Sequence, residues 1–151
     1  MSELTSDRIS ELAIEALERT AFVLAEPGEG LDDFKPDLAA SVSFTGFTNG
    51  SVVLHADRAF ACELAASMMG VDEDEVTPEL EGRDALNELA NIVGGSIITE
   101  LGGRDHDYQY GLPQTVNACD SLPEGTCATV ASEEGMLAIT WVKGNAAQAA
   151  A

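Results

Sequence analysis

The sequence predicts an α+β domain in which long amphipathic helices pack on a mainly antiparallel sheet. Apolar residues recur at helical spacing over residues 5–25 and 78–101, and strand-like runs are joined by short turns that contain glycine. A chain of 151 residues is long enough for one domain with a sizeable core and too short for two ordinary ones. We therefore expect one domain over residues 1–143 and a flexible Ala-rich tail over residues 144–151.

The N-terminal segment, residues 5–25, predicts an amphipathic helix, because its charged residues occupy the side opposite its apolar ones. The apolar positions are Ile9, Leu12, Ala13, Ala16, Leu17 and Leu24. Pro27 and Gly28 close this helix. The next two runs, residues 40–46 and 50–56, predict the strands of a hairpin whose turn is marked by two glycines.

The remaining elements follow from capping and turn residues. Asp57 is a good N-cap for a helix that ends at Met69, before Gly70. Thr77 and Pro78 mark the start of the second long helix, which would be roughly 36 Å long at 1.5 Å per residue. Three strand candidates complete the sheet, over residues 114–119, 125–131 and 136–143.

The net charge of −20, from 27 acidic and 7 basic residues, restricts the possible partners. Nucleic acids and anionic membranes bind basic surfaces, so we expect neither as a partner. No apolar run approaches the ~20 residues needed to span a bilayer. The N-terminus also lacks the basic and apolar regions of a secretion signal. These features predict a cytoplasmic protein.

Neither the cysteines nor the histidines indicate a site. Cys62, Cys119 and Cys127 include no CxxC pair, so we expect buried free thiols. His55 and His106 have no ligand nearby at metal-binding spacing. We therefore expect no metal site and no cofactor held by this chain.

Residues 84–95, with the sequence DALNELANIVGG, place polar groups along one side of the second long helix. Successive helical residues turn by about 100°, so Asp84, Glu88 and Asn91 fall on one stripe, with Gly95 one turn beyond. The opposite stripe is apolar and would face the core: Leu86, Leu89, Ala90, Val93 and Ile97. A carboxylate and a carboxamide thus lie side by side, next to a bare patch of backbone. This layout suits a helix that comes very close to another macromolecule.

An ordinary solvated face is the alternative interpretation, because acidic and amide residues opposite an apolar stripe are common. However, Asn and Gly are poor helix formers, and Gly costs up to about 1 kcal/mol relative to Ala. Ile92 and Ile98 also lie at the margins of the polar face, as they would if it met a partner. The pattern alone leaves both interpretations open.

Four segments occur together in an order that is specific, although a bare ExxN motif is not. They are residues 43–46 with 50–54, residues 65–70, Asp84-xxx-Glu88-xx-Asn91, and residues 112–116. On these segments the chain resembles the CheX/CheC family of chemotaxis phosphatases over roughly residues 42–142. It is most similar to the single-site CheX branch, because the N-terminal helix has no second ExxN motif.

The resemblance implies a CheX-like fold and a hydrolase of the aspartyl phosphate on a CheY-like response regulator, in chemotaxis or another two-component pathway. Asn91 would orient the attacking water, and Glu88 would contact a cationic group of the regulator. The regulator would hold Mg²⁺, and the protein would form a homodimer by pairing sheet edges. The expected partner-binding residues are Asp84, Ile92, Gly94, Gly95 and Ile98.

Two other interpretations remain. A non-catalytic member of the same fold would bind a response regulator or a flagellar-switch component, and the intact pair of Glu88 and Asn91 argues against it. An unrelated acidic α+β domain with a structural role would require the four matching segments to be coincidence.

Overall fold

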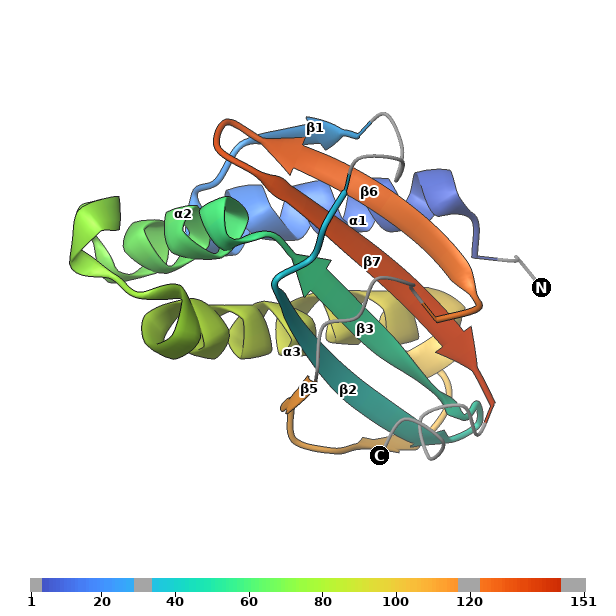
Figure 1. Cartoon of the computed structure of the whole chain (residues 1–151). Coiled ribbons are helices and arrows are strands. Elements are labelled where there is room, and N and C mark those ends of the chain that lie inside the picture. The colour runs from blue at the N-terminus through green and yellow to red at the C-terminus, as the bar shows by residue number, and fades with distance from the viewer. Residues whose placement is uncertain (1–3, 29–33, 117–122, 145–151) are drawn as a thin grey trace.

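Seven strands form one antiparallel sheet in the computed structural model, which describes residues 4–28, 34–116 and 123–144 (Figure 1). The strands are β1 (Ala25–Pro27), β2 (Leu38–Gly46), β3 (Gly50–Ala56), β4 (Tyr108–Tyr110), β5 (Gln114–Val116), β6 (Thr126–Ser132) and β7 (Met136–Lys143). Their order is β1-β6-β7-β3-β2-β4, and β5 also pairs with β2. Every pairing is antiparallel, so the predicted fold class is confirmed.

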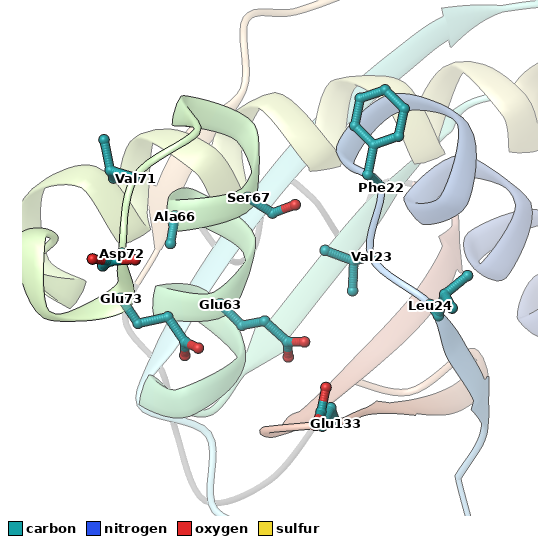
Figure 2. Close-up of a pocket in the computed structure, with 10 residues that line it drawn as sticks. All are labelled: Phe22, Val23, Leu24, Glu63, Ala66, Ser67, Val71, Asp72, Glu73 and Glu133. Carbon is teal, nitrogen blue, oxygen red and sulfur yellow. The ribbon is translucent and has the colours of Figure 1, made fainter.

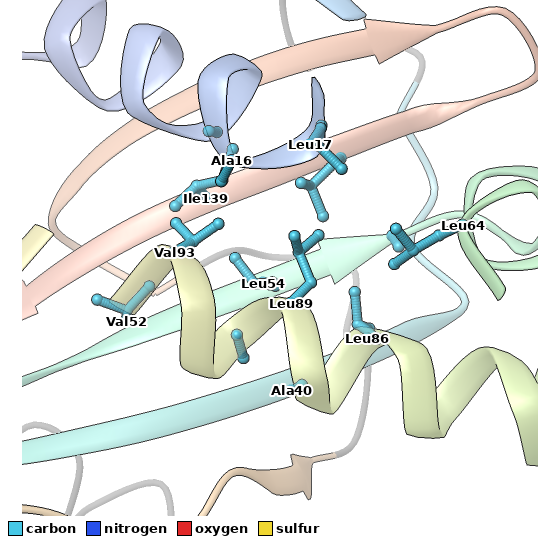
Figure 3. Close-up of a cluster of buried hydrophobic side chains, with 14 of the residues drawn as sticks. Ala16, Leu17, Ala40, Val52, Leu54, Leu64, Leu86, Leu89, Val93 and Ile139 are labelled. Atoms are coloured by element: carbon cyan, nitrogen blue, oxygen red, sulfur yellow. The ribbon is translucent and has the colours of Figure 1, made fainter. Parts of the chain in front are cut away.

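Three helices pack with this sheet: α1 (Ser6–Ala16), α2 (Arg58–Met69) and α3 (Arg83–Ile98). Helix α1 packs mainly on β6, α3 packs on β2 and β3, and α2 lies beside α3. Figure 1 shows α1 and α3 on the same face of the sheet. In the core between these layers, Leu86, Leu89 and Val93 of α3 lie beside Val52 and Leu54 of β3 (Figure 3).

Local signals set both ends of α2 as predicted. The Asp57 side chain accepts a hydrogen bond from the Phe60 N–H (2.8 Å), which caps the first turn. Gly70 ends the helix at φ 71°, a conformation that glycine adopts without strain. The second carboxylate oxygen of Asp57 accepts from the Met136 N–H (3.1 Å). Asp57 therefore also ties the start of α2 to β7.

The N-terminal helix is shorter than predicted. After α1, a π-helical turn (Leu17–Ala21) leads to Phe22, where the chain leaves the helix at φ 57°. A bulky residue rarely adopts this left-handed conformation, and no Gly or Asn marks this helix end in the sequence. Leu24, predicted to face the core, is 74% exposed. The next three residues form β1, of which only Ala25 was predicted to be helical.

The second long helix begins at Pro78 as predicted, but it is not uniform. A π-helical turn (Pro78–Gly82) precedes α3, and another (Thr99–Gly103) follows it. Strand β4 is not among the strands predicted from the sequence. Within the strand predicted over residues 114–119, the structure describes only β5, and Cys119 lies outside the described residues. Apart from Gly144, the predicted tail also lies outside them.

The other cysteines and the histidines differ in exposure. Cys62 and Cys127 are free and half-buried, where full burial was expected. His55 is buried on β3, and His106 is exposed. Within residues 4–28, 34–116 and 123–144, no helix has the length and apolar character needed to cross a bilayer.

Candidate functional site

The polar stripe of α3 faces solvent. Asp84, Glu88 and Asn91 are all exposed, whereas Leu86 and Leu89 on the opposite side are each 1% exposed. The stripe is displayed because α3 packs its apolar side on β2 and β3. A carboxylate and a carboxamide one helical turn apart are therefore open to a second molecule.

Neither Glu88 nor Asn91 uses its side chain to hold the fold together. Among the described residues, neither side chain has a hydrogen bond or an ion pair. The Asn91 amide can both donate and accept a hydrogen bond, and the Glu88 carboxylate can accept several. Their full hydrogen-bonding capacity is thus available to water or to a partner.

The two adjacent glycines of the motif have opposite environments. No heavy atom lies within 4 Å of the position where a Cβ would stand on Gly95, so this part of the polar face is open. Gly94 is buried, and a Cβ there would stand 2.6 Å from Val42 Cγ1 and 3.0 Å from Phe44 Cζ. Gly94 therefore lets α3 approach β2 closely and is not part of the open face.

Ile98, predicted to contact a partner, has a side chain that is 0% exposed. Its helical direction is close to that of Asn91, but the chain folds back beside this end of α3. At Gly103, a Cβ would stand 2.9 Å from Ile98 O and 3.0 Å from the Tyr108 ring. The turn after α3 therefore lies close to both the Ile98 carbonyl and the Tyr108 ring.

Ile92 lies at a different margin, in a groove between α1 and α3. The groove has a volume of about 290 Å³, and Ile92 is half-buried in it. At its rim Arg19 Nη1 is 2.9 Å from Glu15 Oε1. The other lining residues are Leu12, Ala16, Thr20 and Ser96. The motif could not identify the α1 residues, because only the packing of two helices distant in sequence brings them beside it.

A bidentate ion pair holds α1 against the π-helical turn that follows α3. Arg8 Nε is 2.6 Å from Glu100 Oε2, and Arg8 Nη2 is 3.0 Å from Glu100 Oε1. Hydrogen bonding to Arg8 lowers the pKa of Glu100, and the contacts with Glu100 and then Glu11 raise the pKa of Arg8. The pair therefore supports the relative placement of the two helices that form the groove.

The described residues also include no group of three or more His, Cys, Asp or Glu side chains positioned to hold a metal ion. The chemistry displayed on this face is consequently that of one amide, two carboxylates and an open stretch of helix backbone.

The sequence model of the family described as "Chemotaxis phosphatase CheX" matches residues 38–137. This chain belongs to that family. Among curated proteins, no sequence matches the chain significantly.

Solved structures share the fold at low sequence identity. Chemotaxis protein CheX from Vibrio vulnificus has a TM-score of 0.72 and 19% identity, with 91% of this chain and 95% of that chain covered. CheX from Desulfovibrio desulfuricans has a TM-score of 0.69 and 17% identity, with 92% and 98% covered. A CheX–CheY–BeF₃–Mg²⁺ complex from Borrelia burgdorferi is a third match. Its TM-score is 0.66 and its sequence identity is 18%, with 89% of this chain and 94% of that chain covered.

Proposed function

We propose that this protein hydrolyses the aspartyl phosphate of a CheY-like response regulator, with α3 as the face that meets the regulator. The observation that carries the proposal is the exposed pair of Glu88 and Asn91, free of other contacts among the described residues, in a chain of the CheX family. The solved complex of a CheX with CheY supports a regulator of this kind as the partner.

Asn91 positions the water that attacks phosphorus. An acyl phosphate already has a good leaving group, so holding a water in line with the scissile P–O bond is the main contribution left to the phosphatase. The Asn91 amide accepts from and donates to that water without taking its proton. The water oxygen bonds to phosphorus, the bond to the aspartyl oxygen breaks, and the regulator's carboxylate is regenerated. The protons of the water end on inorganic phosphate and in solvent.

Glu88 binds a cationic side chain of the regulator beside the phosphoryl group. A charge-assisted hydrogen bond of this kind fixes both partners in position, which sets the register of α3 in the complex. Asp84, one turn earlier on the same stripe, assists docking. Gly95 leaves room for the regulator next to Asn91, and Ile92 contributes from the adjacent groove.

The proposal also includes the setting of the reaction. The regulator holds Mg²⁺, which supplies neutralisation of phosphoryl charge, and the phosphatase brings no cofactor of its own. Both proteins share the cytoplasm. The phosphatase forms a homodimer, which sedimentation velocity at several concentrations would test.

The direct test measures the decay of ³²P-labelled response regulators from the same genome with and without the protein. If Asn91 orients the water, Asn91→Ala should slow dephosphorylation by about 10²-fold, or roughly 2.7 kcal/mol of transition-state stabilisation. Regulator binding should change little. Gln109→Ala is the matched control, because it removes an exposed amide from β4, outside the motif.

Two outcomes would contradict the proposal in different ways. Near-normal turnover by a folded Asn91→Ala protein would remove Asn91 from the chemistry. Tight binding of a phosphorylated regulator without any faster decay would instead favour the non-catalytic binding module.

A further inference from the structure

A second pocket lies beside α2, and none of its lining residues belongs to α3 (Figure 2). Its volume is about 410 Å³. The walls come from α2, from the connection between α1 and β1, and from the turns that follow α2 and β6. The pocket is therefore separate from the polar stripe that carries Glu88 and Asn91.

The pocket lining exposes large apolar side chains to water. On the side formed by the connection between α1 and β1, Phe22 is 81% exposed and Leu24 is 74% exposed, and across the pocket Val71 is 37% exposed (Figure 2). Apolar side chains gathered on a surface in this way are typical of a site that another molecule covers. Phe22 also holds a left-handed backbone conformation, φ 57°, in which Gly or Asn would be less strained. Neither burial nor backbone geometry within the monomer explains a phenylalanine at this position.

The rest of the lining is largely acidic, and no basic side chain pairs with it among the described residues. Glu63, Glu73 and Glu133 belong to it together with Asp72. Within the part of the chain that the structure describes, the ion pairs all use other carboxylates. Burial, followed by repulsion from neighbouring glutamates, raises the pKa of Glu73. A cationic group placed here would remove that repulsion.

Hydrogen bonds hold the walls in place without a ligand. Ser67 Oγ donates to Ala21 O (2.5 Å), which ties α2 to the segment that carries Phe22. Glu63 accepts from Ser132 Oγ and from the Glu134 N–H, which ties α2 to the turn between β6 and β7. The pocket is preformed, so an occupant need not order it.

We propose that this pocket binds a short segment of another protein in which a Lys or Arg stands next to a large apolar residue. The apolar side chain covers Phe22 and Leu24, and the cation sits between Glu73 and Glu133. Charge complementarity selects this occupant over two others. A second copy of the chain would bring a net charge of −20 to an acidic wall, and a small cation alone would leave Phe22 and Leu24 exposed.

The test uses three fluorescein-labelled nine-residue peptides. One alternates Arg with Leu, one has Ser in place of Leu, and one has Glu in place of Arg. Because a chain at −20 attracts any basic peptide at low salt, anisotropy titrations are made at 0.15 M salt. The Arg/Leu peptide should bind at least tenfold more tightly than either of the others. When this peptide binds, the amide signals of residues 22–24 and 66–67 should shift in ¹⁵N spectra of the protein.

Matched variants distinguish peptide binding in the pocket from nonspecific attraction to the acidic chain. Phe22→Gly should weaken binding of the Arg/Leu peptide at least tenfold, and so should the double variant Glu73→Gln/Glu133→Gln. Leu112→Gly removes an equally exposed apolar side chain elsewhere, and Glu18→Gln/Glu124→Gln removes two exposed charges elsewhere. These controls should change binding by less than twofold. Asn91→Ala should bind the peptide as wild type does, which keeps this test independent of the phosphatase proposal.

Equal losses in the pocket and control variants, or signal shifts confined to α3, would overturn the proposal. So would sedimentation showing that Phe22→Gly abolishes self-association in the absence of peptide, because the occupant would then be a second copy. Thermal unfolding of each variant checks that lost binding is not lost folding.

Discussion

Replacing Gly95 by alanine should stabilise the folded protein and yet slow its reaction. No heavy atom lies within 4 Å of the new Cβ, so the substitution introduces no clash within the monomer. Alanine inside a helix is favoured over glycine by about 1 kcal/mol. For a chain of this size, that gain corresponds to a rise in Tm of about 2–4 °C.

Gly94→Ala is the matched control, because it makes the same chemical change one residue earlier. Its Cβ would stand 2.6 Å from Val42 Cγ1 and 3.0 Å from Phe44 Cζ. Overpacking of this kind costs about 1–3 kcal/mol, of which the helix preference for alanine offsets about 1 kcal/mol. The net effect should be a loss of stability of up to about 2 kcal/mol. Adjacent glycines are thus expected to respond with opposite signs.

Thermal unfolding followed by circular dichroism measures the two stabilities, and decay of the phosphorylated regulator measures turnover. If the regulator approaches the helix backbone at Gly95, Gly95→Ala should lower kcat/KM at least tenfold, or about 1.4 kcal/mol. A stabilised Gly95→Ala protein with full activity would refute the close approach. A destabilised one would refute the open environment assigned to this glycine.

Three further results are expected. Glu88→Ala should weaken regulator binding about tenfold and also slow turnover, whereas Glu88→Gln should keep the shape of the side chain and recover only part of the affinity. Titration calorimetry measures these affinities. Equal affinities for wild type, Glu88→Ala and Glu88→Gln would show that Glu88 is not in the interface. Glu100 has a lowered pKa in the folded state, so its pair with Arg8 stabilises the fold above the unfolded carboxyl pKa of about 4.3 and loses this effect as pH falls further. The stability difference between wild type and Glu100→Gln, from urea titrations, should therefore be constant above about pH 5 and shrink below it, and a pH-independent difference would contradict the pairing. Raising the salt concentration from 0.01 to 0.15 M shortens the Debye length from about 30 to about 8 Å. If the regulator is acidic around its phosphorylation site, this screens its repulsion from a chain with a net charge of −20, and association should become faster. Slower association in stopped-flow measurements would indicate a basic partner.

Helices and strands bounded by capping or turn residues were predictable from the sequence. Asp57 and Gly70 bound α2 correctly, because a cap and a left-handed glycine act within one turn of the residues that they terminate. The bounds of β3 and β7 agree with the prediction for the same reason, since their turns contain glycine. Strands β1 and β4 have three residues each and were not predicted, because pairing with β6 and β2 defines them.

Helical periodicity predicted only part of the site. A rotation of 100° per residue correctly separates Glu88 and Asn91 from the core stripe, because that division depends on the helix alone. It could not assign Gly94 and Ile98, which stand near the boundary of the polar face. Strand β2 covers Gly94, and Ile98 is fully buried at the end of α3, beside the turn that follows the helix. These neighbours lie outside the helix itself.

The edges of the sheet bear on how the protein behaves at high concentration. One edge is β1, whose three residues end at Pro27, and proline has no N–H to donate to a further strand. At the other edge, β5 and β4 pair with successive parts of β2. Long unpaired edges are the usual templates for strand addition and amyloid growth. Among the described residues the edges are short: β1, β4 and β5 have three residues each, and β1 leaves only Thr126–Thr129 of β6 without a strand partner on that side. Concentrated solutions should therefore resist fibril formation, and a dimer joined at these edges would depend on its side-chain contacts more than on its backbone ladder.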